Sequence, residues 1–190
     1  SSAASDVYKR QRNETWTENQ SYQLGSRYHD ERYLSELRGA FSKQDAYDYP
    51  DTSGRDQSAD RLYTRQYTLN WVNSVKLDES WTLGGGADWQ RDMLDDSSRS
   101  SGVAFPSDAD ERDNTGLYAL AQFDNQVWQA ELSGRSDDNE QFGRHNTWQT
   151  GAGWRFVEDY RLSTRYGTGF RAPSFNDLYY PGPGNPDLKP

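Results

Sequence analysis

The sequence predicts an all-β fold: about eight antiparallel strands that form part of a large transmembrane β-barrel. Apolar and polar residues alternate with a period of two in eight segments, the pattern of strands with two different faces. The connections between these segments are alternately short and long, so every hairpin turns tightly at the same end of the sheet. Hydrophobic residues make up only 32% of the chain but aromatic residues reach 14%, so the few apolar side chains are large.

The eight segments follow one another along the chain. The first shows the pattern in its simplest form, because Tyr22, Leu24 and Tyr28 alternate with polar residues or glycine. The same alternation marks residues 22–28, 33–41, 63–75, 81–89, 117–123, 128–132, 148–156 and 160–170. No period of 3.6 residues appears, so no long helix is expected.

The connections have two lengths. Short turns are expected near residues 29–31, 78–79, 124–126 and 158–159. Long loops are expected at residues 44–60, 92–112, 137–145 and 171–190. Short turns on one side and long loops on the other are typical of outer-membrane barrels, which have short periplasmic turns and long extracellular loops.

Such strands suit two architectures, a soluble β-sandwich and a membrane barrel. The strands are about ten residues or longer, as tilted membrane strands require, whereas ordinary strands average nearer six. Aromatic residues gather toward strand ends, which suits interfacial girdles, at Trp71, Trp81, Trp89, Trp148, Tyr160 and Phe170. We therefore expect the apolar face to contact lipid, and the soluble sandwich binding module remains the alternative.

Composition narrows the function further. The net charge is −9 and the pI is about 4.7, which disfavours nucleic-acid binding because such surfaces are basic. Cysteine is absent, which excludes disulfides and thiolate chemistry. Residues 1–11, SSAASDVYKRQ, resemble a translated sequencing adaptor, so we set them apart from the fold. Residues 12–190 are interpreted as a partial barrel.

The end of the chain carries motifs of a known superfamily. A strand ending in Y-G-x-x-F-[RK]-A-P and a loop ending in G-N-P-x-L-x-P resemble the barrel of TonB-dependent outer-membrane receptors. The matching residues are Tyr166, Gly167, Phe170, Arg171, Ala172, Pro173, Gly184, Asn185, Pro186, Leu188 and Pro190. The resemblance implies a barrel of about 22 strands closed by a separate plug, with the plug and the remaining strands missing here.

A second set of motifs is similar to the cobalamin (vitamin B12) receptors of that superfamily. They are RQYTLNW, GGGADWQ, RDNTGLY and the stretch at residues 135–156, RSDDNEQFGRHNTWQTGAGWRF. The resemblance implies uptake of cobalamin in the bacterial outer membrane, energised by the TonB complex acting on the plug. Another TonB-dependent ligand, such as an iron chelate, remains an alternative.

The loop at residues 42–60 holds five aspartates, Asp45, Asp48, Asp51, Asp56 and Asp60. Calcium takes six to eight oxygen ligands, and clustered aspartates can supply several. The cobalamin-receptor resemblance implies a structural calcium site in this loop, built from the Tyr47 carbonyl oxygen, Asp48, and Asp56 or Asp60. A solvated acidic loop without an ion is the alternative.

The same resemblance implies two contacts with the vitamin, Tyr49 beside the calcium pair and Thr115 in the RDNTGLY motif. No catalytic residues are expected. Asp137, Asp138, Glu140 and His145 form no Ser/His/Asp-type constellation and are interpreted as turn residues, so an outer-membrane enzyme is disfavoured.

Overall fold

The structure is a computed structural model. It describes residues 13–50, 54–58, 60–95, 97–100, 102–105, 111–174, 177–178, 185 and 187–189. The adaptor-like tail lies outside these residues. The long strands are β1 (Asn13–His29), β2 (Tyr33–Pro50), β3 (Asp60–Lys76), β4 (Trp81–Leu94), β7 (Glu111–Asp124), β8 (Trp128–Asn139), β9 (Gly143–Val157) and β10 (Tyr160–Gly167). A short 3₁₀ helix, η1 (Arg55–Gln57), and two-residue strands β5 (Arg99–Ser100) and β6 (Val103–Ala104) lie in the loops.

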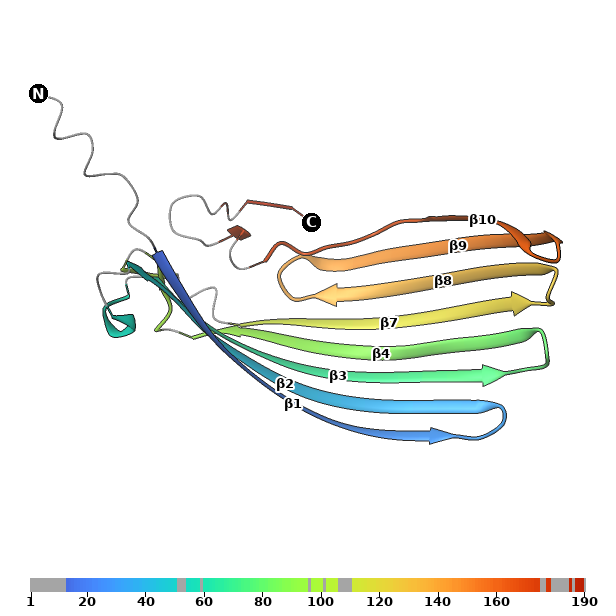
Figure 1. Ribbon diagram of the computed structural model, residues 1–190, viewed down its shortest axis with the longest axis horizontal. Coiled ribbons are helices and arrows are strands. Elements are labelled where there is room, and N and C mark those ends of the chain that lie inside the picture. The colour runs from blue at the N-terminus through green and yellow to red at the C-terminus, as the bar shows by residue number, and fades with distance from the viewer. Residues whose placement is uncertain are drawn as a thin grey trace, which may run out of the picture.

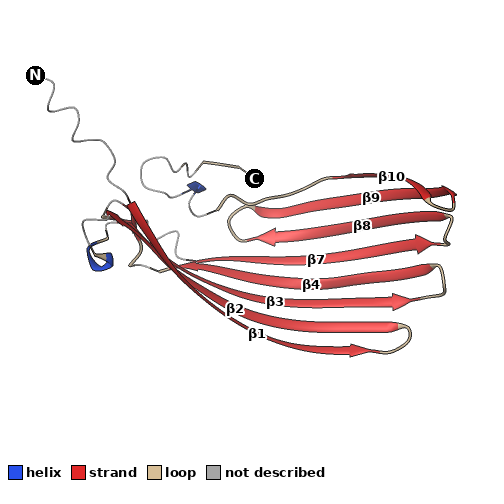
Figure 2. Cartoon of the chain, viewed as in Figure 1, coloured by secondary structure: helices blue, strands red, loops and turns tan. Residues whose placement is uncertain are grey.

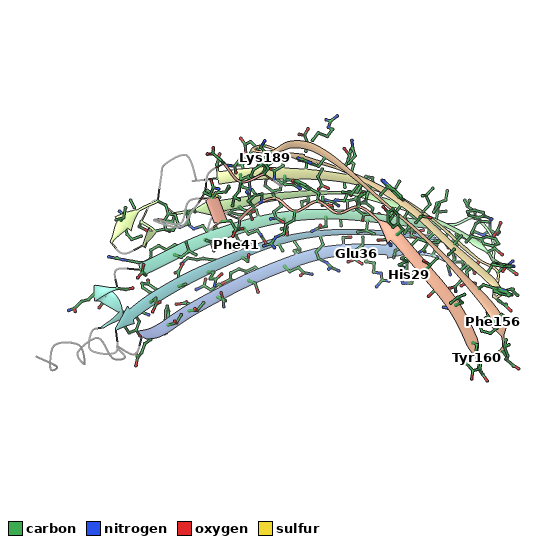
Figure 3. All side chains as sticks on the ribbon, turned by 90° about the horizontal axis from the view of Figure 1, so that it is seen from above. His29, Glu36, Phe41, Phe156, Tyr160 and Lys189 are labelled. Atoms are coloured by element: carbon green, nitrogen blue, oxygen red, sulfur yellow. The ribbon has the colours of Figure 1, made fainter. Side chains whose placement is uncertain are left out.

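The long strands form one antiparallel meander. Their order is β1-β2-β3-β4-β7-β8-β9-β10, each strand pairing with the next along the chain. The sheet is a single curved layer with short turns at one end and long loops at the other (Figures 1, 2 and 3). The predicted all-β fold with eight antiparallel strands is confirmed.

Cross-strand register separates the two faces predicted from the alternation. One row joins Leu37, Trp71, Ala87 and Leu117, and all four are partners in neighbouring strands. We call this side the aromatic face; its large exposed residues include Tyr22, Leu24, Tyr67, Leu69, Trp71, Trp81, Trp128, Leu132, Trp148, Trp154, Leu162 and Tyr166. The opposite side, the polar face, carries Gln66, Asn70, Asp88, Gln122, Glu131, Arg135 and Arg165.

The described residues contain no second sheet against the aromatic face. Only Leu94 and Leu178 are fully buried among the apolar side chains of the described part of the chain. Leu24 is 83% exposed and Leu132 is 60% exposed. An apolar surface of this extent marks a site of membrane or protein contact, and the sandwich alternative would have required a covering sheet. No helix of the described residues is long and apolar enough to cross a bilayer.

One of the predicted long loops is wrong. β8 continues to Asn139 and β9 begins at Gly143, so the expected loop at 137–145 is a tight turn. Gly143 has a φ of +76°, which glycine adopts at little cost, and the Asn139 side chain accepts hydrogen bonds from the amides of Gln141 and Phe142. The acidic stretch SDDNE was predicted to form a loop, but most of it continues strand β8. The Arg135 side chain compensates the charge of Asp137 there.

Candidate functional site at the long-loop end of the sheet

The aromatic face changes character toward the long loops. From the row of Tyr22, Phe41 and Tyr67 upward, the same face carries ion pairs among its aromatic side chains. Lys43 Nζ lies 2.6 Å from Asp45 Oδ2, Arg65 Nη2 lies 3.2 Å from Asp95 Oδ2, and Arg91 Nη2 lies 2.6 Å from Asp113 Oδ2. Charges on a lipid-facing surface are costly near mid-membrane and cheap at the interface. This row therefore marks the upper limit of the apolar band.

The predicted calcium residues lie above that limit, where β2 passes into β3. Asp48 and Asp60 are direct partners across the two strands. The buried Ser58 lies next to both, since its Oγ is 2.6 Å from the carbonyl oxygens of Asp48 and Asp60. The base of the loop is thus held closed beside the two carboxylates.

Two carboxylate oxygens near this base have no described hydrogen-bond partner. Asp48 Oδ1 and Asp45 Oδ1 are both buried and unpaired within the described residues. A buried charged oxygen without a partner is costly, and a cation would remove that cost. However, the described residues contain no group of three or more acidic or histidine side chains placed to hold a metal ion. Asp48, Asp56 and Asp60 are therefore not gathered into one ligand set, and Asp51 lies outside the described residues.

Asp56 belongs to η1, which the sequence did not predict. The neighbouring residue Arg55 places its guanidinium 4.3 Å from the ring centroid of Trp16 and 5.4 Å from that of Tyr47. Tyr47 also accepts a 3.0 Å hydrogen bond from the Tyr63 hydroxyl. Cation–π contacts of this kind hold the loop against the aromatic face of β1 and β2. The phenol of Tyr47 is engaged in this packing, so a calcium contact by Tyr47 would come from its carbonyl oxygen.

The two predicted vitamin contacts lie far apart. Thr115 is the register partner of Trp89, which pairs with Leu69, which in turn pairs with Gly39. Gly39 and Tyr49 are ten residues apart in β2, a separation of roughly 34 Å along the strand. Thr115 also shares the aromatic face with Trp89. The structure does not bring Tyr49 and Thr115 together.

The polar face carries a charged network that the sequence analysis missed. Arg135 of β8 binds Asp88 of β4 through Nη1 and Nη2 at 2.7 and 2.8 Å, and Asp137 through Nε and Nη2 at 2.7 and 2.6 Å. To reach β4 its side chain crosses β7 above Gly116. A Cβ at Gly116 would lie 2.1 Å from Arg135 Nη2. The bridge therefore requires glycine at this position, because any side chain would clash with the guanidinium.

A second polar cluster lies nearer the long loops and is centred on Asp92 of β4. Its Oδ1 accepts hydrogen bonds from the amides of Gln66 at 2.8 Å and Gln90 at 3.0 Å. Arg112 of β7 places Nη2 3.8 Å from Asp92 Oδ2. Arg112 is 9% exposed. Together the two clusters place paired polar and charged side chains of β3, β4, β7 and β8 on the upper half of the polar face.

The predicted position of Phe170 is wrong. The alternation placed it on the aromatic face, but β10 ends at Gly167. Phe170 instead stacks on His145 with ring centroids 4.0 Å apart and planes 9° apart. His145 is the register partner of Asp137 and belongs to the polar face, so the chain has crossed to that side. His145, interpreted as a turn residue from sequence, lies within β9.

In the run of three glycines at 84–86, Gly86 lies on the polar face of β4. A Cβ at Gly86 would lie 2.2 Å from the Trp71 carbonyl oxygen and 2.6 Å from the Tyr118 hydroxyl. Part of the space above Gly86 is thus filled by Tyr118 of β7, on the polar face.

Known proteins resemble this chain both in sequence family and in fold. The family model of the TonB-dependent receptor-like β-barrel matches residues 2–190. The crystal structure of the siderophore receptor PirA from Pseudomonas aeruginosa is similar, with a TM-score of 0.68, 14% sequence identity and coverage of 85% of this chain. The chain spans about 28% of that receptor. At this identity the likeness is one of fold.

Proposed function

The chain belongs to the TonB-dependent receptor-like β-barrel family, and on that premise we propose that it is part of an outer-membrane receptor for cobalamin whose extracellular loops are ordered by calcium. Barrels of this family lie in the bacterial outer membrane, and its members are transporters, not enzymes. The aromatic face is then the lipid-facing surface, and the polar face lines the lumen. TonB, acting on a plug, supplies the energy for uptake.

The observation that carries the cobalamin proposal is the stretch at residues 135–156, together with RQYTLNW, GGGADWQ and RDNTGLY in the same order as in cobalamin receptors. The fold shared with a siderophore receptor does not select between ligands. An iron chelate is therefore the second candidate, and the binding experiment below includes it.

The calcium proposal rests on the base of the loop at residues 42–60. Asp48 and Asp60 face each other across β2 and β3, and Asp48 Oδ1 is buried with no described partner. In this proposal the two carboxylates hold a calcium ion, and Asp56 and the Tyr47 carbonyl oxygen, which the structure does not gather with them, complete the site when the loop closes on the ion. Calcium prefers oxygen ligands of this type. By ordering the loop, the ion would present Tyr49 to the vitamin.

The test measures cobalamin affinity of the complete receptor in detergent, with calcium and with a chelator. Two ligands that stabilise the same loop conformation must be coupled reciprocally, typically by about 1–3 kcal/mol, or roughly 5–150-fold in affinity. Asp48→Ala should lower affinity in calcium and remove most of the calcium dependence. Asp159→Ala is the matched control, because Asp159 is an exposed aspartate in the short turn between β9 and β10, at the opposite end of the sheet from this loop.

Each other outcome removes one part of the proposal. Affinity that ignores calcium, with Asp48→Ala silent, would make the loop a solvated acidic surface. Binding of an iron chelate without binding of cobalamin would retain the receptor and replace its ligand.

Thr115 is proposed separately as a contact for the vitamin, on the resemblance of its motif. Thr115→Ala should weaken cobalamin binding and leave the calcium dependence intact. Thr115 lies on the aromatic face in the row of Trp89 and Leu69, so unchanged affinity would remove Thr115 from the site.

A further inference from the structure

The short helix η1, in the loop between β2 and β3, is held by an aromatic clamp at the long-loop end of the sheet (Figure 1). Trp16 of β1 and Tyr47 of β2 are register partners, and their ring centroids lie 5.5 Å apart. The Arg55 guanidinium of η1 lies 4.3 Å from the Trp16 ring centroid and 5.4 Å from that of Tyr47. We call Trp16, Tyr47 and Arg55 the clamp. Tyr63 supports it from β3, because its ring packs edge-on against Tyr47 at 5.5 Å.

The clamp lies on the aromatic face. Trp16 and Tyr22 are an even number of residues apart in β1, and so are Tyr47 and Phe41 in β2. Side chains with such a spacing share one face of a strand, and the register of β1 with β2 runs through this region without a shift. Arg55 therefore draws η1 toward the aromatic face of the sheet.

The carboxylates at the base of the same loop lie on the opposite face. Asp48 and Asp60 are register partners, and Asp60 is an even number of residues from Gln66, which belongs to the polar face. Asp48 Oδ1 is buried and has no partner among the described residues. Asp56 belongs to η1, which the clamp draws to the other side of the sheet. This separation explains why the described residues gather no third acidic side chain beside Asp48 and Asp60.

We propose that the clamp opposes calcium binding. Its cation–π contacts hold η1 toward the aromatic face, and they must break before Asp56 can join Asp48 and Asp60 around an ion. Calcium and the clamp thus compete for the position of η1, because each favours a different arrangement of the same loop. The proposal rests on the proposed function, since it concerns the calcium site proposed for this loop. Trp16 and Arg55 then set the calcium concentration at which the loop becomes competent to bind the vitamin.

The test removes one ring of the clamp and keeps every charge. The calcium affinity of the complete receptor in detergent is measured by titration calorimetry, without vitamin, for the parent and for Trp16→Leu. Cation–π contacts at exposed sites are strong enough to shift an equilibrium roughly 3–10-fold, so Trp16→Leu should tighten calcium binding by that factor. The matched control is Tyr22→Leu, which removes a ring from the same face of β1 and makes no contact with the clamp. It should leave the calcium affinity unchanged.

Arg55→Gln shows whether the Trp16 ring acts through the guanidinium. This variant loses a positive charge near the ion as well as the clamp, so its own gain in affinity does not distinguish the two causes. In the Arg55→Gln background, however, Trp16→Leu should have no further effect, because the contact between the two side chains is already gone. Unchanged or weaker calcium binding in Trp16→Leu would overturn the proposal, and so would an equal gain with and without Arg55.

A second readout follows the position of η1 directly. The whole sequence lacks cysteine, so spin labels attach only at introduced thiols. A label at Gln57→Cys in η1 is paired with one at Gln20→Cys on the aromatic face of β1, or with one at Gln44→Cys on the polar face of β2. Calcium should lengthen the 57–20 distance and shorten the 57–44 distance. Trp16→Leu should shift both distances in the same directions without calcium, and unchanged distances in both experiments would contradict the clamp.

These measurements separate the clamp from the proposed function. A receptor that binds calcium equally tightly in the parent and in Trp16→Leu retains the calcium site and loses the role of the clamp. A receptor that binds no calcium in either form contradicts the calcium site itself, and the role of the clamp with it. Binding of an iron chelate in place of cobalamin would change the ligand and leave the effect of Trp16 on calcium standing.

Discussion

At the scale of single residues, Gly116 shows how an absent side chain permits a long-range contact. Arg135 and Asp88 lie on strands that are not neighbours, with β7 between them. A bidentate arginine–carboxylate pair is strong for its class, but here it forms only because nothing projects from Gly116. The side chains of Arg135 and Asp88 are 34% and 21% exposed, so water screens the pair only in part.

Replacement of Gly116 by alanine should break this bridge. The new Cβ would lie 2.1 Å from Arg135 Nη2 and 2.7 Å from Asp88 Oδ2. The guanidinium must therefore move away from Asp88, while it can keep its hydrogen bonds to Asp137, which lies on the same strand as Arg135. We expect a loss of about 1–2 kcal/mol in the stability of the complete receptor, the range for a part-exposed charge-assisted contact. The temperature at which the folded gel band disappears measures it. In an Asp88→Asn background the same substitution should cost less, and an equal cost in both backgrounds would show that the bridge is not what Gly116 protects.

At the scale of elements, three of the short turns share one arrangement, in which an Asp or Asn side chain accepts hydrogen bonds from backbone amides of the turn. The Asp30 Oδ1 accepts from the amides of Arg32 and Tyr33, Asp78 Oδ1 from Ser80 and Trp81, and Asn125 Oδ1 from Val127 and Trp128, all between 2.7 and 3.2 Å. Asx side chains bond in this way to the backbone two residues on. Each turn is thus fixed by its first polar residue, and the register of the following strand follows from it.

Asp78 provides the cleanest test of this arrangement. Asp78→Ala leaves the amides of Ser80 and Trp81 to water and should destabilise the β3–β4 hairpin by about 1 kcal/mol. Asp78→Asn should be close to neutral, because Asn125 performs the same role in its own turn. Melting of the folded gel band compares the two variants, and equal losses from alanine and asparagine would mean that the charge matters, not the hydrogen bonds.

Asp30 adds a dependence on pH. Backbone hydrogen bonds from Arg32 and Tyr33 hold the pKa of its carboxyl below the ordinary value of 3.8. A group with a lowered folded pKa contributes stability above its unfolded pKa and loses it as pH falls through the folded pKa. This turn should therefore loosen only below about pH 4, and in Asp30→Asn that loosening should be absent when hydrogen exchange of the Tyr33 amide is followed across the acid range.

At the scale of the whole molecule, periodicity alone predicted the eight strands, their two faces and the side of the short turns. Those features are local, because period-2 alternation and turn formation depend on residues that are neighbours in the sequence. The length of the strands toward the loops was underestimated, since β1 begins at Asn13 where no apolar alternation marks it. Phe170 was misplaced because the pattern ran on past Gly167. The bridge from Arg135 to Asp88 was missed because the two residues are 47 positions apart in sequence.

The separation of the two faces also predicts which side of the sheet contacts lipid, namely the aromatic face. Leu69 is 46% exposed on the aromatic face, between Trp71 and the row of Tyr67 that limits the apolar band. Asn70 follows it on the polar face, between Arg38 and Asp88 in register. A charge facing lipid near mid-membrane costs about 2–4 kcal/mol and less toward the interface. Leu69→Arg should therefore cost about 2 kcal/mol, whereas Asn70→Arg enters a polar, aqueous surface.

Assembly of the complete receptor in cells measures the difference, as the fraction of protein that runs as the compact, heat-modifiable form. Leu69→Arg should reduce that fraction sharply, and Asn70→Arg at the same depth should leave it near the level of the parent. Leu69→Gln separates charge from lost apolar area, because it removes the leucine without adding a charge and should fall between the two. If Leu69→Arg and Asn70→Arg assemble equally well, the aromatic face does not meet lipid, and its exposed tryptophans must be covered by protein instead.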